Sequence, residues 1–248
     1  MKLANAQIII TGAAKGMGRF FAEAASAAGA KVFAGDIDES GLASLSPVIG
    51  RAHLDVTSRE SRTKFIQVAL ASMGGISVLV NNAGILKDAL LVRKDRKTGD
   101  ISILDEASWN QVLDVNLTGA TMMVRDCVAH MASAGVSEGV IVNMSSISRH
   151  GNRGQSNYVA AKAALAANTV TWAREFAPLN IRVGAIAPGM IETPMTDNMS
   201  ERARDAAVSA VPLKRIGQPQ DIWRGVQFII ECDYFTGSTI DIHGGLTF

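Results

Sequence analysis

The feature that most constrains the fold is an alternation of short apolar runs with longer helical stretches along the whole chain. The apolar runs are rich in β-branched and aliphatic residues and begin near residues 7, 31, 52, 78, 140, 181 and 239. Helical patterns lie between most of them, at 17–28, 58–73, 106–133, 157–177 and 219–231. Continuous apolar strands suit a sheet covered on both faces, and strand–helix alternation indicates parallel strands. We therefore expect an α/β fold, a doubly wound parallel sheet of the Rossmann type with helices on both faces.

The chain is expected to form a single domain over residues 1–248. No internal repeat, low-complexity tract or linker rich in proline and glycine divides it. Within the domain, 190–213 contains three methionines followed by a polar helical pattern. Flexible methionine side chains suit an apolar surface that changes shape, so this segment is interpreted as a substrate lid, with core packing as the equal alternative.

A second segment, 87–104, is interpreted as a hairpin insertion. Thr98, Gly99 and Asp100 form a turn signal, and apolar residues on either side could pair as two short strands. The hairpin would leave the sheet at its carboxyl end, where ligands bind in such folds. Its basic residues either attract the phosphates of a coenzyme A thioester or form a solvated tip; they are Arg93, Lys94, Arg96 and Lys97.

Composition excludes several classes of function. The chain has 24 basic and 23 acidic residues and lacks the basic stripe typical of nucleic-acid binding. Its two cysteines and four histidines show no spacing typical of a disulfide framework or a metal site. The first residues lack a full signal peptide, and no apolar run is long enough to span a bilayer. We expect a cytoplasmic protein with no metal and no nucleic-acid or membrane partner.

A glycine-rich turn follows the first predicted strand and indicates a dinucleotide site. Gly12, Gly16 and Gly18 allow the backbone to approach a pyrophosphate, whose charge then lies at the start of the next helix. Asp36, at the end of the second strand, can accept hydrogen bonds from the adenosine ribose and would repel a 2′-phosphate. Lys15 would attract such a phosphate, so NAD(H) is favoured and NADP(H) stays possible.

One of the two tyrosines lies four positions before a lysine in an alanine-rich helical run. Tyr158 and Lys162 therefore share a helical face, and their polar tips can meet. A phenol beside an ammonium is either a harmless surface pair or a group tuned for proton transfer. The pair alone favours the surface interpretation, so a role in proton transfer has to be supported by other motifs in the chain.

Together with these residues, six short motifs resemble those of the short-chain dehydrogenase/reductase family, in order and over essentially the whole chain. They are TGAAKGMG at 11–18, LDVT at 54–57, NNAG at 81–84, DVNLTG at 114–119, NMSSIS at 143–148 and APGMIETPM at 187–195. The resemblance implies a catalytic tetrad of Asn116, Ser145, Tyr158 and Lys162. It also implies cofactor contacts from Gly12, Lys15, Gly16, Met17, Gly18, Asp36, Asp55, Val56, Asn82, Ala83, Gly84, Tyr158, Lys162, Pro188, Gly189, Ile191 and Thr193.

The implied chemistry is hydride transfer between NAD(P)(H) and a ketone or secondary alcohol. Lys162 and the cofactor are expected to lower the pKa of Tyr158, which exchanges the proton. Ser145 would bind the substrate carbonyl, and Asn116 would hold a water that links Lys162 to solvent.

Within the family, the longer phrases at 145–165, 181–195 and 233–246 are similar to bacterial 3-oxoacyl-(acyl carrier protein) reductases. That subgroup implies a 3-oxoacyl thioester substrate and a homotetramer. The late turns of the two helices beside the site carry little positive charge, so the carrier is left open between acyl carrier protein and coenzyme A. The alternatives are a secondary or cyclic alcohol dehydrogenase acting on a small free ketone, and a nucleotide-binding sensor without activity.

Overall fold

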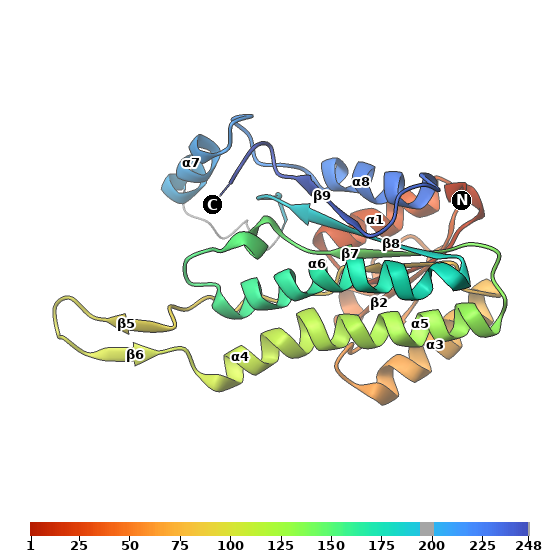
Figure 1. Ribbon diagram of the computed structural model, residues 1–248, viewed down its shortest axis with the longest axis horizontal. Helices are drawn as coiled ribbons and strands as arrows, with labels where there is room; N and C mark the ends of the chain where they lie inside the picture. The colour runs from red at the N-terminus through yellow and green to blue at the C-terminus, as the bar shows by residue number, and fades with distance from the viewer. Residues whose placement is uncertain (194–200, 248) are drawn as a thin grey trace.

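The computed structural model describes residues 1–193 and 201–247. One seven-stranded sheet forms the centre, in the order β3-β2-β1-β4-β7-β8-β9, and every neighbouring pair in it is parallel (Figure 1). This confirms the expected single-domain α/β fold. The strands are β1 (Gln7–Thr11), β2 (Lys31–Asp36), β3 (Gly50–His53), β4 (Val78–Asn81), β7 (Gly139–Met144), β8 (Ile181–Pro188) and β9 (Ser238–Ile242).

Helices cover both faces of the sheet, as the apolar strands predict. In β1, Ile8 and Ile10 pack into one core cluster while Ile9, pointing the other way, packs into a second. The first cluster includes residues of α1 (Gly16–Ala27) and α8 (Pro219–Glu231). The second includes residues of α3 (Arg59–Met73), α5 (Ala120–Ser133) and α6 (Ser156–Phe176). Each run of apolar residues in a central strand therefore contributes to two cores.

The strand order reverses at β1, and this reversal positions the site. β1 pairs with β2 on one side and with β4 on the other, so Ile8 lies opposite both Val32 and Val78. The loops that leave the carboxyl ends of β1 and β4 diverge to opposite faces, which leaves a crevice where ligands bind in open parallel sheets.

Several details differ from the expectations. The 106–133 stretch is α4 (Glu106–Leu113) and α5 joined by a π-helical turn, Asp114–Gly119, which its helical pattern does not reveal. Strand β3 begins two residues before the apolar run that predicted it. Part of the predicted lid forms α7 (Glu201–Ala210), while 194–200 lie outside the described residues. The remaining short helices are η1 (Leu3–Asn5), α2 (Glu39–Ala43), η3 (Ile147–His150) and η4 (Ala177–Leu179).

An antiparallel hairpin lies within the segment interpreted as an insertion. It consists of β5 (Val92–Lys94) and β6 (Ile101–Ile103), and all six strand residues are exposed. The hairpin extends well beyond the sheet at the left of Figure 1. Within the described ranges 1–193 and 201–247, no helix is long and apolar enough to cross a membrane.

A buried ion pair joins α3 to α5. Arg62 is 4% exposed; its Nε lies 3.2 Å from Asp126 Oδ2, and its Nη1 donates to the Val56 carbonyl at 2.7 Å. Arg125 binds the same carboxylate at 2.6 Å from the surface, where its own side chain is 56% exposed. Because a guanidinium keeps its charge in a protein interior, Arg62 depends on Asp126 as its counter-charge.

Asp126→Ala should lower the free energy of unfolding by about 3 kcal/mol, since it leaves a buried cation without its partner. Arg125→Ala is the matched control: it removes only an exposed pair and should lower the free energy of unfolding by less than about 1 kcal/mol. Urea unfolding at equal protein concentration measures both values. Equal small losses would show that the Val56 carbonyl alone suffices to hold Arg62.

Candidate active site

The loop after β1 requires glycine at three positions. Gly12 and Gly16 have φ of +66° and +57°, in the left-handed region. A Cβ on Gly18 would lie 2.1 Å from the Gly12 carbonyl oxygen, and one on Gly12 would lie 2.8 Å from the Cα of Ala83. The glycines therefore let the start of α1 approach the ends of β1 and β4 more closely than any side chain would permit.

The NNAG segment after β4 braces this loop. Asn82 donates its side-chain Nδ2 to the carbonyls of Thr11 and Gly12, each at 3.0 Å. In return, the Thr11 hydroxyl accepts the amides of Asn82 at 3.1 Å and Ala83 at 3.0 Å. Two motifs 70 residues apart in the sequence are thus joined across the crevice, with Gly84 next to them.

The start of α1 fits the pyrophosphate of a dinucleotide. Lys15 is the N-cap residue and makes no side-chain capping bond, and the first turn contains no acidic residue. The amides of that turn, where Gly16 and Met17 lie, are therefore not capped by a side chain, and they carry the positive end of the helix dipole. Lys15 itself is exposed.

Asp36 lies at the end of β2 beside the same loop. Its Oδ2 accepts the amide of Ala14 and its Oδ1 accepts the amide of Asp38, both at 3.0 Å. Each carboxylate oxygen has a second lone pair, so the group can still accept hydrogen bonds from a ribose. Its position over the loop suits the role expected from the sequence.

The predicted adenine contacts follow β3. Asp55 accepts the Thr57 amide at 2.9 Å and the Thr57 hydroxyl at 2.7 Å. Burial pulls the pKa of Asp55 upward, but these hydrogen bonds outweigh it and leave the pKa below its usual value. Val56 is buried, and its side chain closes against Gly119 of the π-helical turn.

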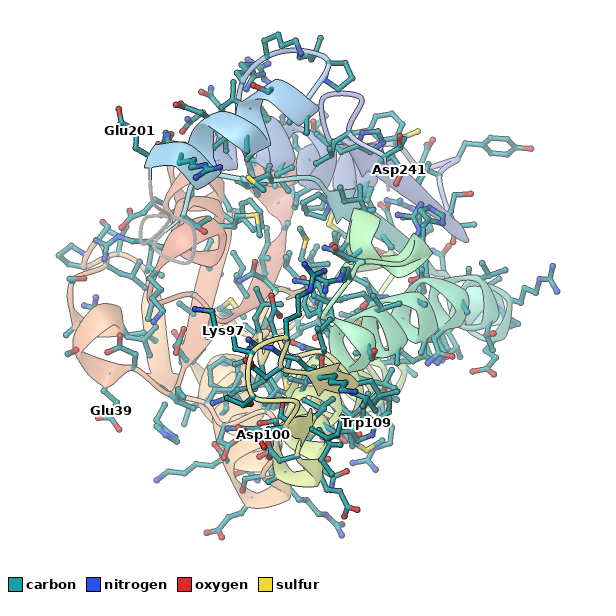
Figure 2. All side chains as sticks on the ribbon, turned by 90° about the vertical axis from the view of Figure 1, so that its left-hand side faces the viewer. Glu39, Lys97, Asp100, Trp109, Glu201 and Asp241 are labelled. Carbon is teal, nitrogen blue, oxygen red and sulfur yellow. The ribbon has the colours of Figure 1, made fainter. Side chains whose placement is uncertain are left out.

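The last predicted cofactor segment follows β8. Pro188 ends the strand, and the next amide, that of Gly189, donates to the carbonyl of Ile242 at 2.9 Å. Ile191 is buried, and Thr193 is the last described residue before the gap. The structure therefore brings all the predicted cofactor residues to the carboxyl edge of one sheet. Figure 2 looks onto this edge, with Glu201 of α7 at the upper left and Lys97 of the hairpin near the centre.

Lys162 is buried under Tyr158 and anchored to β7. Its ammonium donates to the carbonyl of Met144 at 2.7 Å, and its Nζ lies 5.5 Å from the centre of the Tyr158 ring. Lys162 is 4% exposed, and this burial lowers its pKa to about 8. Tyr158 and Lys162 therefore share one face of α6, as expected, and the ammonium lies between the Tyr158 ring and the Met144 carbonyl.

The pKa of Tyr158 differs from the expectation. Burial raises it to about 12; a hydrogen bond with the Ser146 hydroxyl lowers it, and the charge of Asp88 raises it. The sequence predicts that Lys162 lowers the pKa of Tyr158, but Lys162 is not among the protein groups that shift this pKa. The phenol is therefore protonated at neutral pH in this environment.

The structure separates the two adjacent serines. Ser145 donates its hydroxyl to the main-chain carbonyl of Lys162 at 2.9 Å, so it is turned toward α6. Ser146 is the residue whose hydroxyl reaches the phenol of Tyr158. Ser146, which the sequence analysis did not single out, is therefore the serine beside the phenol. The two consecutive serines indicate that either could face the site, because β7 ends at Met144 and side chains beyond the strand need not point to alternate faces.

Asn116 lies in the π-helical turn and is fully buried. Its Oδ1 accepts the amide of Ile85 at 2.9 Å, and its Nδ2 donates to the carbonyl of Ile85 at 2.8 Å. The side chain thus pairs with both main-chain groups of Ile85 in the loop after β4. Its Oδ1 lies so close to Gly84 that a Cβ there would be only 2.7 Å away. Asn116 therefore fixes the loop that borders the site.

Comparison with known proteins agrees with this geometry. A family model described as enoyl-(acyl carrier protein) reductase matches residues 12–247. The 3-oxoacyl-(acyl-carrier-protein) reductase FabG of Thermotoga maritima is 41% identical over 256 residues, covering 99% of each chain. FabG of Escherichia coli strain K12 is 34% identical over 96% of each chain. Nodulation protein G of a Rhizobium species is 34% identical over 99% of this chain and 98% of its own. The chain therefore belongs to the short-chain dehydrogenase/reductase family of NAD(P)-dependent oxidoreductases.

Proposed function

We propose that this oxidoreductase reduces a 3-oxoacyl thioester to the 3-hydroxyacyl thioester, with NADH as the favoured cofactor. The observation that carries the proposal is a phenol with a serine hydroxyl in hydrogen-bonding range, beside the glycine-rich crevice. These groups are Tyr158 and Ser146, and Lys162 lies beneath the phenol. The thioester is supported by the names of the full-length relatives, which are 3-oxoacyl-(acyl-carrier-protein) reductases.

Tyr158 acts as the proton donor. NAD(P)H, when bound, would supply the hydride for the carbonyl carbon, and the carbonyl oxygen would then need a proton from the protein. With its pKa raised to about 12, the phenol is protonated at neutral pH, the form that reduction needs. An alkoxide is far more basic than a phenolate, so the proton transfers readily. In the reverse direction the same group accepts the proton.

Ser146 is proposed to donate a hydrogen bond to the substrate carbonyl and so to stabilise charge developing on that oxygen. Lys162 has two roles: its charge stabilises the phenolate formed after proton transfer, and it is placed to hold the nicotinamide ribose. Ser145 and Asn116 support these groups, Ser145 through the main chain of Lys162 and Asn116 through the loop at Ile85. This replaces the carbonyl-binding role that the sequence assigned to Ser145.

NAD(H) is favoured because the charge of Asp36, at the end of β2, would repel a 2′-phosphate on the adenosine ribose. Two unit charges at about 4 Å cost roughly 4 kcal/mol at an effective dielectric constant of 20. Lys15 offers only partial compensation, since it is exposed and its charge also acts on Asp38, whose pKa is lowered mainly by a hydrogen bond from Gly41. Assembly as a homotetramer stays a prediction from the family resemblance, and a cytoplasmic location stays a prediction from the sequence.

Turnover of a 3-oxoacyl thioester tests the function directly. With acetoacetyl-coenzyme A, the protein should oxidise NADH, measured by absorbance, and Tyr158→Phe should reduce kcat by at least about a hundredfold because the transferable proton is lost. NADH affinity, measured by fluorescence titration, should stay within a few-fold of the wild-type value. Turnover of cyclic or small free ketones alone would instead favour the alcohol dehydrogenase alternative.

The two serines should differ sharply in their effect on the rate. Ser146→Ala should lower kcat by about a hundredfold, the usual effect of removing a hydrogen bond to a developing oxyanion. Ser145→Ala is the matched control; it loses one bond to a main-chain carbonyl and should lower kcat by less than about tenfold. Steady-state kinetics on both variants decide the assignment, and the opposite order would restore Ser145 as the carbonyl-binding serine.

Asp36→Ala should move the cofactor preference toward NADPH by a factor of ten or more. The change removes a ribose acceptor and a like charge together, so kcat/KM for NADH falls while kcat/KM for NADPH rises. The ratio of the two values, measured with one substrate, is the readout. A wild-type protein that already prefers NADPH would show that Lys15 outweighs Asp36.

A further inference from the structure

A cavity of about 520 Å³ lies between the β5–β6 hairpin and the loop that precedes α6. Its polar lining consists of Arg93 and Ser102 from the hairpin, Arg153 from the loop, and Asp88 between them. The cofactor crevice described above uses other residues, so this pocket is a separate feature.

The base of the pocket is held in place by hydrogen bonds. The amide of Ala89 donates to the carbonyl of Gly154 at 2.9 Å, and Gln155 donates its side-chain amide to Asp88 at 2.9 Å. These bonds join the start of the insertion to the loop that carries Arg153. The hairpin and Arg153 are therefore fixed relative to each other, although both are exposed to solvent.

The strand register turns two polar side chains toward the pocket. Arg93 pairs with Ser102 across the hairpin, so their side chains lie on the same face. The other face carries Val92 and Ile101, both about 60% exposed, and Ile103, which also borders the pocket. The sequence alternation thus places a guanidinium and a hydroxyl together on the side that faces Arg153.

The charges in this pocket favour an anion. Within residues 1–193 and 201–247, Arg153 makes no hydrogen bond or ion pair, and Arg93 has only an exposed contact at 3.7 Å to Asp95. The carboxylate of Asp88 is turned to Gln155. The guanidinium groups of Arg93 and Arg153 and the hydroxyl of Ser102 can together donate several hydrogen bonds to one phosphate group.

The pocket also borders the reaction site. Asp88 lines it, and its charge acts on the phenol of Tyr158. Gln155, which holds Asp88, lies three residues before that tyrosine. A substrate with its carbonyl at Tyr158 can therefore extend along this side toward the hairpin.

We propose that Arg93, Ser102 and Arg153 bind the phosphate at the far end of the substrate's phosphopantetheine arm. The inference rests on the proposed function, because a free ketone has no such phosphate. Coenzyme A and acyl carrier protein both present this group, so the pocket recognises a chemistry that the two carriers share. The hairpin thereby selects thioesters on a phosphorylated carrier over short ketones.

The test compares acetoacetyl-coenzyme A with acetoacetyl-N-acetylcysteamine, a thioester that ends before the phosphate. Arg153→Gln and Arg93→Gln should each lower kcat/KM for the coenzyme A thioester about tenfold, mainly through KM. The same variants should change kcat/KM for the phosphate-free thioester less than twofold. Lys97→Gln is the matched control, since it removes one positive charge from the exposed hairpin outside the pocket (Figure 2).

Each outcome has one meaning. If Arg153→Gln and Lys97→Gln affect the coenzyme A thioester equally while both thioesters are reduced, the pocket assignment is wrong and the proposed function stands. If the wild-type protein reduces free ketones and neither thioester, the proposed function itself is wrong. With acetoacetyl-acyl carrier protein as substrate, the two arginine variants should show the same tenfold loss of kcat/KM. A loss seen only with the coenzyme A thioester would overturn the proposal, because the pocket would then bind the nucleotide phosphates of coenzyme A and not the phosphate of the arm.

Discussion

The chemistry of this protein depends on how α6 is fixed to β7. Apolar packing alone would let a helix slide over a sheet, whereas hydrogen bonds to fixed acceptors do not. Two such bonds join the elements, Lys162 to the Met144 carbonyl and Asn143 to the Thr169 hydroxyl, and a third runs from Ser145, just past β7, to the Lys162 carbonyl. Because these bonds set the register of the helix, they decide that Tyr158 meets Ser146, the second residue past the end of the strand.

This anchoring has an electrostatic consequence. An ammonium buried as deeply as that of Lys162 is destabilised, which is why its pKa falls to about 8, and burial likewise raises that of Tyr158 to about 12. Both shifts favour the neutral forms, so the pair holds less charge at rest than its residue types imply. The protein environment therefore keeps Tyr158 protonated, so that it can donate a proton. Negative charge on its phenol has to be stabilised only when that proton is transferred.

The sequence predicts the layers of this fold well because they follow from periodicity. The stretches 17–28 and 219–231 correspond to α1 and α8 within one residue, since apolar spacing and flanking residues set their ends. The Ser145/Ser146 choice could not be made this way, because both residues have the same chemistry and strand alternation stops before them. The π-helical turn was equally hidden, since Asn116 pairs with Ile85, 31 positions away. Long-range hydrogen bonds leave no local pattern.

The insertion shows how specificity can be added without altering the core. All six strand residues of the hairpin are exposed, so its sequence can vary without loss of buried area in either core cluster. A two-stranded hairpin is only marginally stable by itself. Its order therefore depends on the bonds at its base, Ala89 to Gly154 and Asp88 to Gln155, which lie directly before α6. The same loop that starts the Tyr158 helix thus positions the hairpin, so a ligand that orders one end also constrains the other.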